Sequence, residues 1–320
     1  MISDLTKLEK IGSSFHIAFL LVFTVIGFIG NGLTIFVVVR VKKLSKPTNF
    51  FIANLAVADL IVCVIVNPFY VTTIIYQGWP LENDICKFIG FLTAWSCGAS
   101  LMNLAAIAIN RYMCIVWSHH YKRTFSEKNT ILFCCSTWIL ALVSVLPPLF
   151  GFGSYDLNTN LMSCNISSSH DSWLYMASIL SIYFGFTGLI TCFCYYKIFK
   201  LVRTSSKKTK SQLPTERKKK QLFHRTDVKM AKNLLLVSLI FVVCWAPIMV
   251  LSIADMHGTT PVFLWRVVGI LALANSMINP FIYARRNRAF QQAYLQTMKC
   301  NWANFSSIND SFRHTDSTAG

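Results

Sequence analysis

The chain has 320 residues, of which 54% are hydrophobic and only 13% are charged, and its formal net charge is +17. Soluble domains carry about 25% charged residues, and disordered chains contain few apolar ones, so the composition excludes both classes. A chain with so little polar surface must gather its cations at particular places.

Seven long apolar stretches follow one another, each close to the length of about 20 residues that a helix needs to cross a bilayer. They lie at about 15–39, 50–76, 86–117, 130–150, 173–196, 234–254 and 266–284. The first is too long for a secretory signal core and lacks a following cleavage site, so we interpret it as a retained span. The expected fold class is an all-α membrane protein with a seven-transmembrane helix bundle.

Positive charges predict the orientation, because loops rich in Lys and Arg stay in the cytoplasm. With the N-terminus outside, the outer segments hold only Lys7, Lys10, Lys87 and Arg266 as cations. The expected organisation is an extracellular N-terminus over 1–14, a transmembrane domain over 15–284 with a polybasic inner loop at about 197–233, and a cytoplasmic part over 285–320. The basic side then meets membrane lipid and a cytosolic partner, so no nucleic acid is needed to explain the charge.

The cysteines agree with this topology. Of the 11 cysteines, only Cys86 and Cys164 fall on the outer, oxidising side, which predicts one disulfide between them, the alternative being two free thiols. In the same outer loop, Asn165-Ile166-Ser167 is a sequon, so Asn165 is a candidate glycosylation site, although such triplets also arise by chance.

Polar residues inside the spans are costly and therefore point to function. Asp59 is the only carboxylate in the middle of a span, and the spans offer oxygen donors for it. A candidate sodium site is formed by Asp59, Ser100, Asn275 and Asn279. The alternative is a water-filled hydrogen-bond network without a metal.

Short motifs occur in a fixed order on these spans. They are Gly30-Asn31, Asn54-Leu55-Ala56-Val57-Ala58-Asp59, Cys86, Asn110-Arg111-Tyr112, Trp138, Cys164, Cys244-Trp245-Ala246-Pro247 and Asn279-Pro280-Phe281-Ile282-Tyr283. In these residues the chain resembles a rhodopsin-like (class A) G-protein-coupled receptor, and the resemblance covers almost the whole chain.

The resemblance implies a role for several residues. Arg111, with Asn110 and Tyr112 beside it, would hold the inactive state and then meet a heterotrimeric G protein. Trp245 would form the pocket floor, and Tyr195 and Tyr283 would swing inward on activation. It also implies an amphipathic eighth helix over 286–294, a palmitoylation site at Cys300, and a Ser- and Thr-rich tail that a receptor kinase could phosphorylate to recruit arrestin.

The chain departs from the family at two switch positions. Asn110 replaces the usual acid before the arginine, and Asp227 lies 18 residues before Trp245, where the family often places an acid that reaches the arginine. We therefore hypothesise an Arg111–Asp227 ion pair that closes the cytoplasmic side. Thr187 replaces the usual proline of the fifth helix, so we expect that helix to be less distorted.

Within the family, the pattern is most similar to the melatonin receptors, for example at Gly78-Trp79, Ser118 and Asn275-Ser276. The positions that would hold melatonin's polar ends differ, being Pro148 and Ser168, and helix seven reads Asn279-Pro280 where that subgroup has Asn-Ala. The ligand therefore stays unassigned.

The expected ligand pocket is apolar, aromatic and uncharged, which suits a small, largely neutral ligand. It comprises Thr93, Cys97, Tyr183, Trp245, Ile248, Met249, Trp265 and Leu273. Thr93 stands where amine receptors have an aspartate, and Leu273 stands where opsins have the retinal lysine, so neither a cationic amine nor retinal is expected. The alternative is that these side chains only pack the bundle.

The function expected is that of a plasma-membrane signalling receptor, not an enzyme, with no cofactor required. A constitutively active or decoy receptor is one alternative, favoured by Asn110 and Thr187. An ion transporter using Asp59 is another, although it would need a polar path or inverted repeats that the sequence does not show.

Overall fold

The computed structural model describes residues 2–167, 169, 172–208, 215–255 and 259–299, with side chains described from residue 12 onward and not over 205–226. The elements in chain order are α1 (Ile2–Arg40), α2 (Pro47–Ile61), η1 (Val62–Val66), α3 (Asn67–Ile75), α4 (Asn83–Ile115), α5 (Ser118–Thr124), α6 (Glu127–Val145), η2 (Pro147–Phe150), β1 (Tyr155–Asn158), β2 (Ser163–Ile166), α7 (Trp173–Leu180), η4 (Ser181–Phe186), α8 (Thr187–Lys208), α9 (Thr215–Ala254), α10 (Val262–Arg286) and α11 (Arg288–Met298).

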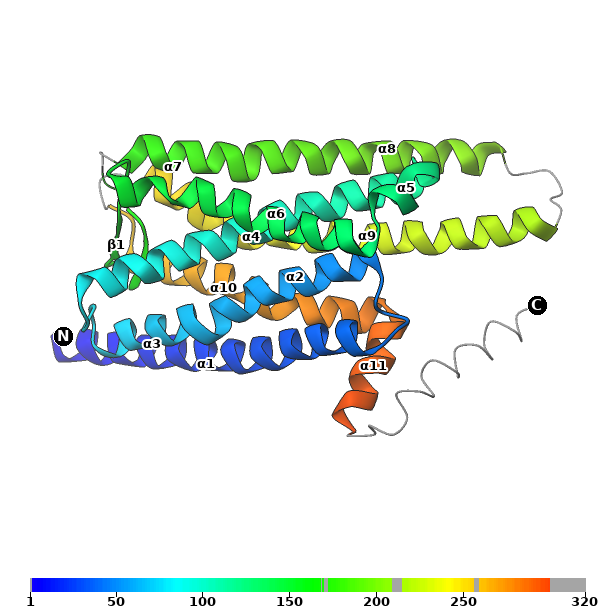
Figure 1. Cartoon of the computed structure of the whole chain (residues 1–320). Helices are drawn as coiled ribbons and strands as arrows, with labels where there is room; N and C mark the ends of the chain where they lie inside the picture. Colours follow the sequence, from blue (N-terminus) through cyan, green and yellow to red (C-terminus); the bar gives the residue numbers. More distant parts are fainter. Residues whose placement is uncertain (1, 168, 170–171, 209–214, 256–258, 300–320) are drawn as a thin grey trace.

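Seven helical stretches of the described chain are long and apolar enough to cross a membrane. They are Gly12–Arg40, Pro47–Ile75, Asn83–Ile115, Glu127–Phe150, Trp173–Thr204, Asp227–Ala254 and Val262–Arg286. These match the seven predicted stretches, and Figure 1 shows them running alongside one another as a single bundle. The β1–β2 hairpin lies at the end of the bundle that carries the N-terminus, and α11 lies across the opposite end.

The helices extend further than hydropathy predicts. The segment expected as an extracellular N-terminus is helical from Ile2, and most of the expected inner loop is helix too, because α8 continues to Lys208 and α9 begins at Thr215. Both helical extensions have one cause. Apolar composition ends at the membrane boundary, but Lys, Arg, Gln and Glu form helices well in water, so the backbone continues the helix past that boundary.

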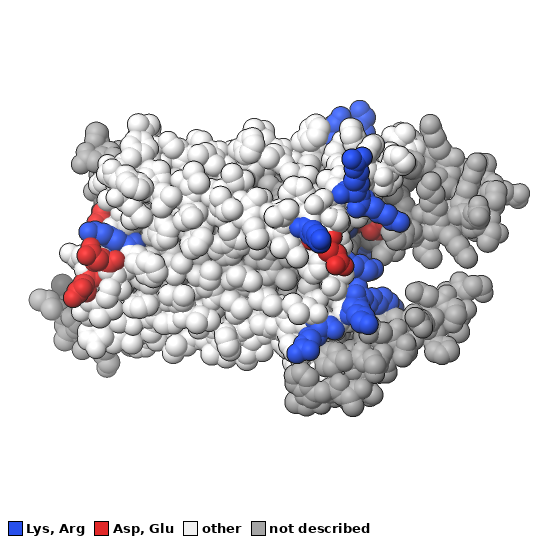
Figure 2. Space-filling model, viewed as in Figure 1, with Lys and Arg blue, Asp and Glu red and all other residues white. Residues whose placement is uncertain are grey.

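The bundle buries polar groups and exposes apolar ones. Asn31, Asp59 and Asn103 are at most 2% exposed, whereas Leu132 and Leu189 are 66% and 72% exposed. This arrangement suits a protein whose surroundings are lipid tails and whose polar residues face the interior. In the view of Figure 2, Lys, Arg, Asp and Glu appear only at the two ends of the molecule, separated by a wide belt free of charge.

Helix α4 is the central helix, packed against α2, α6, α8 and α9 and against the hairpin. A hydrogen-bond network connects the middle of α4 to two neighbouring helices. Asn54 Nδ2 of α2 donates to Asn103 Oδ1 of α4 at 3.0 Å, and Asn54 Oδ1 accepts from Trp138 Nε1 of α6 at 2.8 Å. Each buried polar group thereby gains a partner, which fixes the rotation of the three helices around one another.

The fifth span contains a full π-helical segment, η4, between α7 and α8. The expectation that Thr187 leaves this helix less distorted is therefore wrong. A wide turn of this kind interrupts the regular hydrogen-bond ladder, and the Thr187 hydroxyl donates to the Tyr183 carbonyl within it. The fifth span is therefore distorted beside a threonine, although it lacks the proline to which we attribute such a distortion.

The amphipathic eighth helix is α11. Its N-cap Asn287 accepts a hydrogen bond from Ala289 N at 3.0 Å, and its inner face buries Phe290, Ala293 and Tyr294 completely or nearly so. The Tyr294 hydroxyl lies 2.7 Å from Thr34 Oγ1 of α1, which ties the eighth helix to the first. The predicted palmitoylation site Cys300 and the Ser- and Thr-rich tail lie outside the described residues.

Candidate functional site

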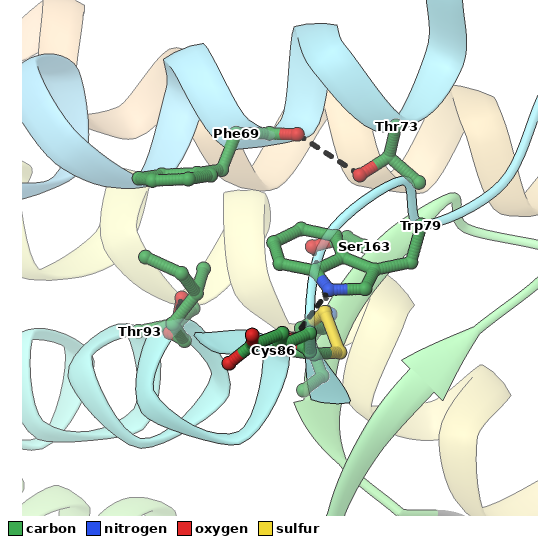
Figure 3. The surroundings of a disulfide bond; sticks show 10 residues. Phe69, Thr73, Trp79, Cys86, Thr93 and Ser163 are labelled. Carbon is green, nitrogen blue, oxygen red and sulfur yellow. Dashed lines mark hydrogen bonds between the residues drawn. A yellow bond between two sulfur atoms is a disulfide. The ribbon is translucent and has the colours of Figure 1, made fainter. Parts of the chain in front are cut away.

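A disulfide joins Cys86, in the first turn of α4, to Cys164 of β2, with 5.4 Å between the two Cα atoms. Figure 3 shows Trp79 beside this bond, and the Trp79 indole donates to the Glu82 carbonyl at 3.0 Å. Because β2 pairs antiparallel with β1, with Leu157 opposite Cys164, the bond fixes the whole hairpin against the outer end of α4. The predicted disulfide is confirmed.

A cavity of about 80 Å³ lies beneath this hairpin. The predicted pocket residues that line it are Thr93, Cys97, Tyr183, Trp245, Ile248, Met249 and Trp265. Leu273 is the exception, because it is absent from the lining and is buried in a hydrophobic cluster with Val62, Ile248 and Trp265. The structure thus brings together all but one of these residues around one cavity.

Several lining residues were not predicted. The hairpin contributes Asn158, Leu161, Asn165 and Ile166, and the fifth span contributes Met176, Ile179 and Leu180. One feature of the sequence could have indicated the hairpin residues of the lining. Asn165 and Ile166 directly follow Cys164, whose disulfide holds β2 against the outer end of α4. The hairpin therefore forms the roof of the cavity.

Few polar groups in the lining are free to meet a ligand. Thr93 donates to the Ile89 carbonyl and Ser252 to the Ile248 carbonyl, each at 2.8 Å. The Trp265 indole donates to Asp255 at 3.0 Å. The indole N–H of Trp245, a residue of the lining, is buried and has no hydrogen-bond partner among the described residues.

Asn165, the candidate glycosylation site, lines this cavity and is half-buried. Its Nδ2 atom, to which a glycan would be attached, donates to Ser163 Oγ at 3.1 Å. Glycosylation of Asn165 stays a prediction, and in the structure this residue forms part of the wall of the cavity.

Asp255 organises the outer end of α9 above the cavity. Its carboxylate accepts from the backbone N–H groups of Thr259 at 2.7 Å and Thr260 at 3.1 Å, and from the Trp265 indole. Burial by itself would raise the pKa of this carboxyl, but the hydrogen bonds, the largest from Trp265, hold the pKa below its usual value. The acid is therefore engaged in holding α9 and α10 together and does not reach the ligand cavity.

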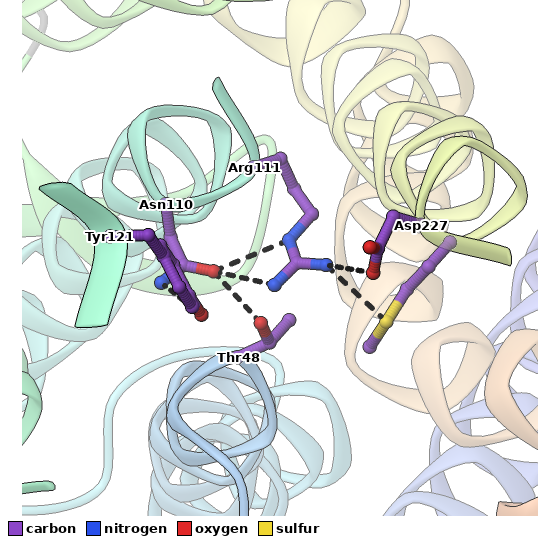
Figure 4. Close-up of polar contacts among 6 residues, drawn as sticks. Thr48, Asn110, Arg111, Tyr121 and Asp227 are labelled. Carbon is purple, nitrogen blue, oxygen red and sulfur yellow. Dashed lines mark hydrogen bonds and ion pairs between the residues drawn. The ribbon is translucent and has the colours of Figure 1, made fainter. Parts of the chain in front are cut away.

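At the opposite end, Arg111 Nη1 of α4 lies 3.8 Å from Asp227 Oδ1 of α9 (Figure 4). This is the ion pair that the sequence predicts. The Arg111 side chain is 3% exposed and that of Asp227 is 17% exposed. Arg111 Nη1 also lies 3.6 Å from the sulfur of Met230, so α9 covers the guanidinium with more than one side chain.

Asn110 supports Arg111 from the same helix. Its Oδ1 accepts from Arg111 Nη2 at 2.8 Å, from Arg111 Nε at 3.3 Å and from Thr48 Oγ1 of α2 at 2.8 Å, as Figure 4 shows. Its Nδ2 donates to the Tyr121 hydroxyl of α5 at 3.3 Å. A neutral amide here supplies the hydrogen bonds that a carboxylate would supply, without its charge.

The remaining predicted switch residues are Tyr112, Tyr195 and Tyr283. The hydroxyls of Tyr195 and Tyr283 are both buried and have no hydrogen-bond partner among the described residues. The Tyr283 ring lies 5.7 Å from that of Phe290 in α11, and the Tyr112 ring 6.0 Å from that of Phe193 in α8. Unpaired buried hydroxyls indicate side chains that gain a partner in another arrangement or from water.

The candidate sodium residues all lie in the core. Asp59 Oδ2 accepts from Asn279 Nδ2 at 2.8 Å, and Ser100 and Asn275 are 5% and 2% exposed. The amide oxygens of Asn31, Asn275 and Asn279 have no donor among the described residues. A buried carboxylate with several unpaired neutral oxygens fits a small hard cation or ordered water.

Known proteins are similar to this chain in sequence or in fold. Residues 30–283 match the family described as 7 transmembrane receptor (rhodopsin family). The melatonin receptor type 1C of Gallus gallus is 32% identical over 283 residues, covering 87% of this chain and 80% of its own. The melatonin receptor type 1B of Homo sapiens is 31% identical over 291 residues, covering 89% and 78%. The crystal structure of squid rhodopsin has the same fold, with a TM-score of 0.79 at 22% identity, covering 91% of this chain and 87% of its own.

Proposed function

Because the chain belongs to the rhodopsin family of seven-transmembrane receptors, we propose that it binds a small, largely neutral extracellular ligand beneath the β1–β2 hairpin and responds by activating a heterotrimeric G protein. It is a multi-pass protein of the plasma membrane, and its sequence relatives are melatonin receptors. The ligand itself is left open, since Pro148 and Ser168 differ from that subgroup.

One observation carries the proposal: a single helix joins the cavity to the ion pair. Helix α9 holds Trp245 and Met249 in the cavity lining and Asp227 beside Arg111. At 1.5 Å per residue, the 18 residues from Asp227 to Trp245 span about 27 Å. A small rotation of the inner segment of α9 about the internal Pro247 would therefore displace Asp227 from Arg111.

The lining restricts the chemistry of the ligand. It contains no Asp, Glu, Lys or Arg among the described residues, so a cationic amine would lose its hydration without gaining a counter-ion. It contains no lysine for a retinal Schiff base. The free Trp245 N–H suits a ligand with one hydrogen-bond acceptor on an otherwise flat, apolar body.

Two further parts of the proposal concern the state of the bundle. A sodium ion bound through Asp59, Ser100, Asn275 and Asn279 would favour the closed state by holding the spans together. A receptor kinase and arrestin would act on the cytoplasmic tail, and the basic cytoplasmic ends of the helices would lie against anionic lipid.

The test is a panel of G-protein activation assays in cells, with melatonin, related indoles, amines, peptides and light. An agonist should lose its effect when Cys97→Phe fills the cavity, and should be weakened by Trp245→Phe, which removes only the indole donor. Cys135→Phe and Trp173→Phe are matched controls, because both side chains are exposed on the outer surface of the bundle.

Three outcomes would contradict the proposal. An agonist that acts equally on Cys97→Phe binds elsewhere. High signalling with no compound, unchanged by the whole panel, indicates a constitutively active receptor. Ion flux that depends on Asp59 without G-protein activation indicates a transporter.

A further inference from the structure

A second cavity opens between the outer ends of α1 and α10, with a volume of about 650 Å³. Its lining includes His16 of α1 and Arg266 of α10, whereas the cavity beneath the hairpin has no charged residue in its described lining. We propose that this second cavity binds an amphiphile with a single carboxylate headgroup and an apolar tail. The ligand differs from the neutral one proposed above, and the two sites share no lining residue.

The polar end of the cavity holds buried groups that lack partners. His16 is 3% exposed, and neither nitrogen of its imidazole ring has a hydrogen-bond partner among the described residues. The nearest ring is that of Tyr70, whose centroid lies 5.4 Å away in an edge-on arrangement and whose hydroxyl is also unpaired. Burying such groups without partners is unfavourable, so a ligand headgroup that reaches His16 would supply hydrogen bonds that the described residues do not.

Arg266 provides the charge. Its Nε atom is buried without a partner, and its Nη1 makes one long contact, 3.4 Å from Ser13 Oγ. Among the described residues, no carboxylate lies within ion-pair distance of it. A guanidinium offers two parallel N–H groups that fit the two oxygens of a carboxylate. One guanidinium and one imidazole match a single negative charge better than the double charge of a phosphate monoester.

The other end of the cavity suits a hydrocarbon tail. The rings of Phe15, Phe19 and Phe263 line it and are 64%, 50% and 69% exposed. These side chains belong to membrane-spanning helices, so their exposed faces meet the lipid tails. A tail entering from the bilayer between α1 and α10 would remain in apolar surroundings along its whole length while its headgroup reaches Arg266.

The cavity adjoins the hairpin that covers the first one. Thr159 and Met162 of the hairpin turn line the second cavity, and Leu161 between them lines the first. Leu161 packs against α10 so closely that a Cβ atom at Gly269 would lie 2.6 Å from Leu161 Cδ1. The same turn therefore forms a wall of both cavities, yet a change at His16 or Arg266 leaves the first lining intact.

The experiment uses the full chain in nanodiscs of phosphatidylcholine and a photoreactive oleate with its reactive group in the tail. Saturable labelling is expected on peptides containing 12–19 and 262–270. The double variant His16→Leu/Arg266→Gln should lower the labelling affinity about tenfold or more, because hydrogen bonds to charged groups are lost. The control Lys87→Gln removes an exposed outer cation that already pairs with Asp84 at 3.1 Å, and should change nothing.

Competition identifies the source of the charge. Unlabelled oleate should displace the probe, and oleyl alcohol, which lacks the carboxylate, should not. Displacement by phosphatidylserine but not by oleate would overturn the assignment to a free carboxylate amphiphile. Labelling that does not saturate, or that is unchanged in the double variant, would mean that water or neutral lipid fills the cavity. In case the double variant does not fold, oleate should raise the melting temperature of the unaltered protein above that with oleyl alcohol, and equal melting temperatures overturn the proposal.

Discussion

Replacing Asp227 by Asn should raise signalling in the absence of any ligand. The substitution keeps the size and hydrogen-bonding ability of the side chain but removes the charge that lies 3.8 Å from the Arg111 guanidinium. The pair joins α4 to α9, so its loss removes an attraction that exists in the closed arrangement and is weakened when α9 moves away.

The structure sets the size of this effect. At 3.8 Å the Coulomb attraction is about 4 kcal/mol for an effective dielectric constant of about 20. Asp227 is 17% exposed, and the asparagine would still hydrogen-bond, so the net loss is about 1–2 kcal/mol. That loss multiplies the ratio of open to closed receptor by about 5- to 30-fold. If the open state is about 1% populated, its population rises to between about 5% and 25%.

The assay is basal nucleotide exchange on the G protein, compared at equal surface expression. Asp84→Asn is the matched control, because it removes the same charge from an ion pair with Lys87 whose members are 53% and 88% exposed at the outer end. Its basal activity should equal that of the unaltered protein. Unchanged basal activity in Asp227→Asn, or an equal rise in Asp84→Asn, would refute the idea that this pair closes the cytoplasmic side.

Three other changes test the packing around the sites. Gly98→Ala would place a methyl group against the Tyr183 side chain, so we expect thermal melts to show a free energy of unfolding lower by about 1–3 kcal/mol. Gly188→Ala is the control, because its added methyl group meets no atom within 4 Å and should leave the stability unchanged. Phe290→Ala, at a fully buried position of α11, should lower the free energy of unfolding by about 3–5 kcal/mol. Phe150→Ala, at an 84% exposed position, should change it little, and equal losses in the two variants would contradict the docking of α11. The pKa of Asp255 is lower when folded, so its stabilising effect is complete above the ordinary value of 3.8 and disappears as the pH falls through the folded value. The difference in melting temperature between the unaltered protein and Asp255→Asn should therefore shrink below about pH 4, and a constant difference would contradict this.

Hydropathy, charge and cysteine position predict most of the architecture, because a bilayer determines where apolar segments, cations and disulfides can lie. The seven spans and the disulfide between Cys86 and Cys164 are confirmed. The Arg111–Asp227 pair follows from the family resemblance, because the family often places an acid 18 residues before the tryptophan of helix six, and the structure confirms it. The membrane itself and the family pattern thus account for the features that the sequence predicts correctly.

The cavity was only partly accessible, because its roof is not helical. No periodicity places the turn 158–162 over the bundle; that position depends on the strand register and on Leu161 fitting where Gly269 leaves room. Leu273 was assigned to the pocket by its position in the helix, but the packing of Ile248 and Trp265 around it excludes it from the lining. The π-helical turn at 181–186 was missed because its distortion involves a threonine hydroxyl in place of a proline.

The substitution of an amide for an acid at Asn110 changes how the switch is controlled. Asn110 and Arg111 belong to the same helix, so the hydrogen bonds between them do not join α4 to α9. A carboxylate at position 110 would add a charge that competes with Asp227 for the guanidinium in both arrangements. With a neutral neighbour, Arg111 is attracted more strongly across the gap to α9. If the proposed function holds, the free energy that a ligand must supply to open the receptor is set largely by contacts between α4 and α9, which the ligand reaches through the same helix that carries Trp245.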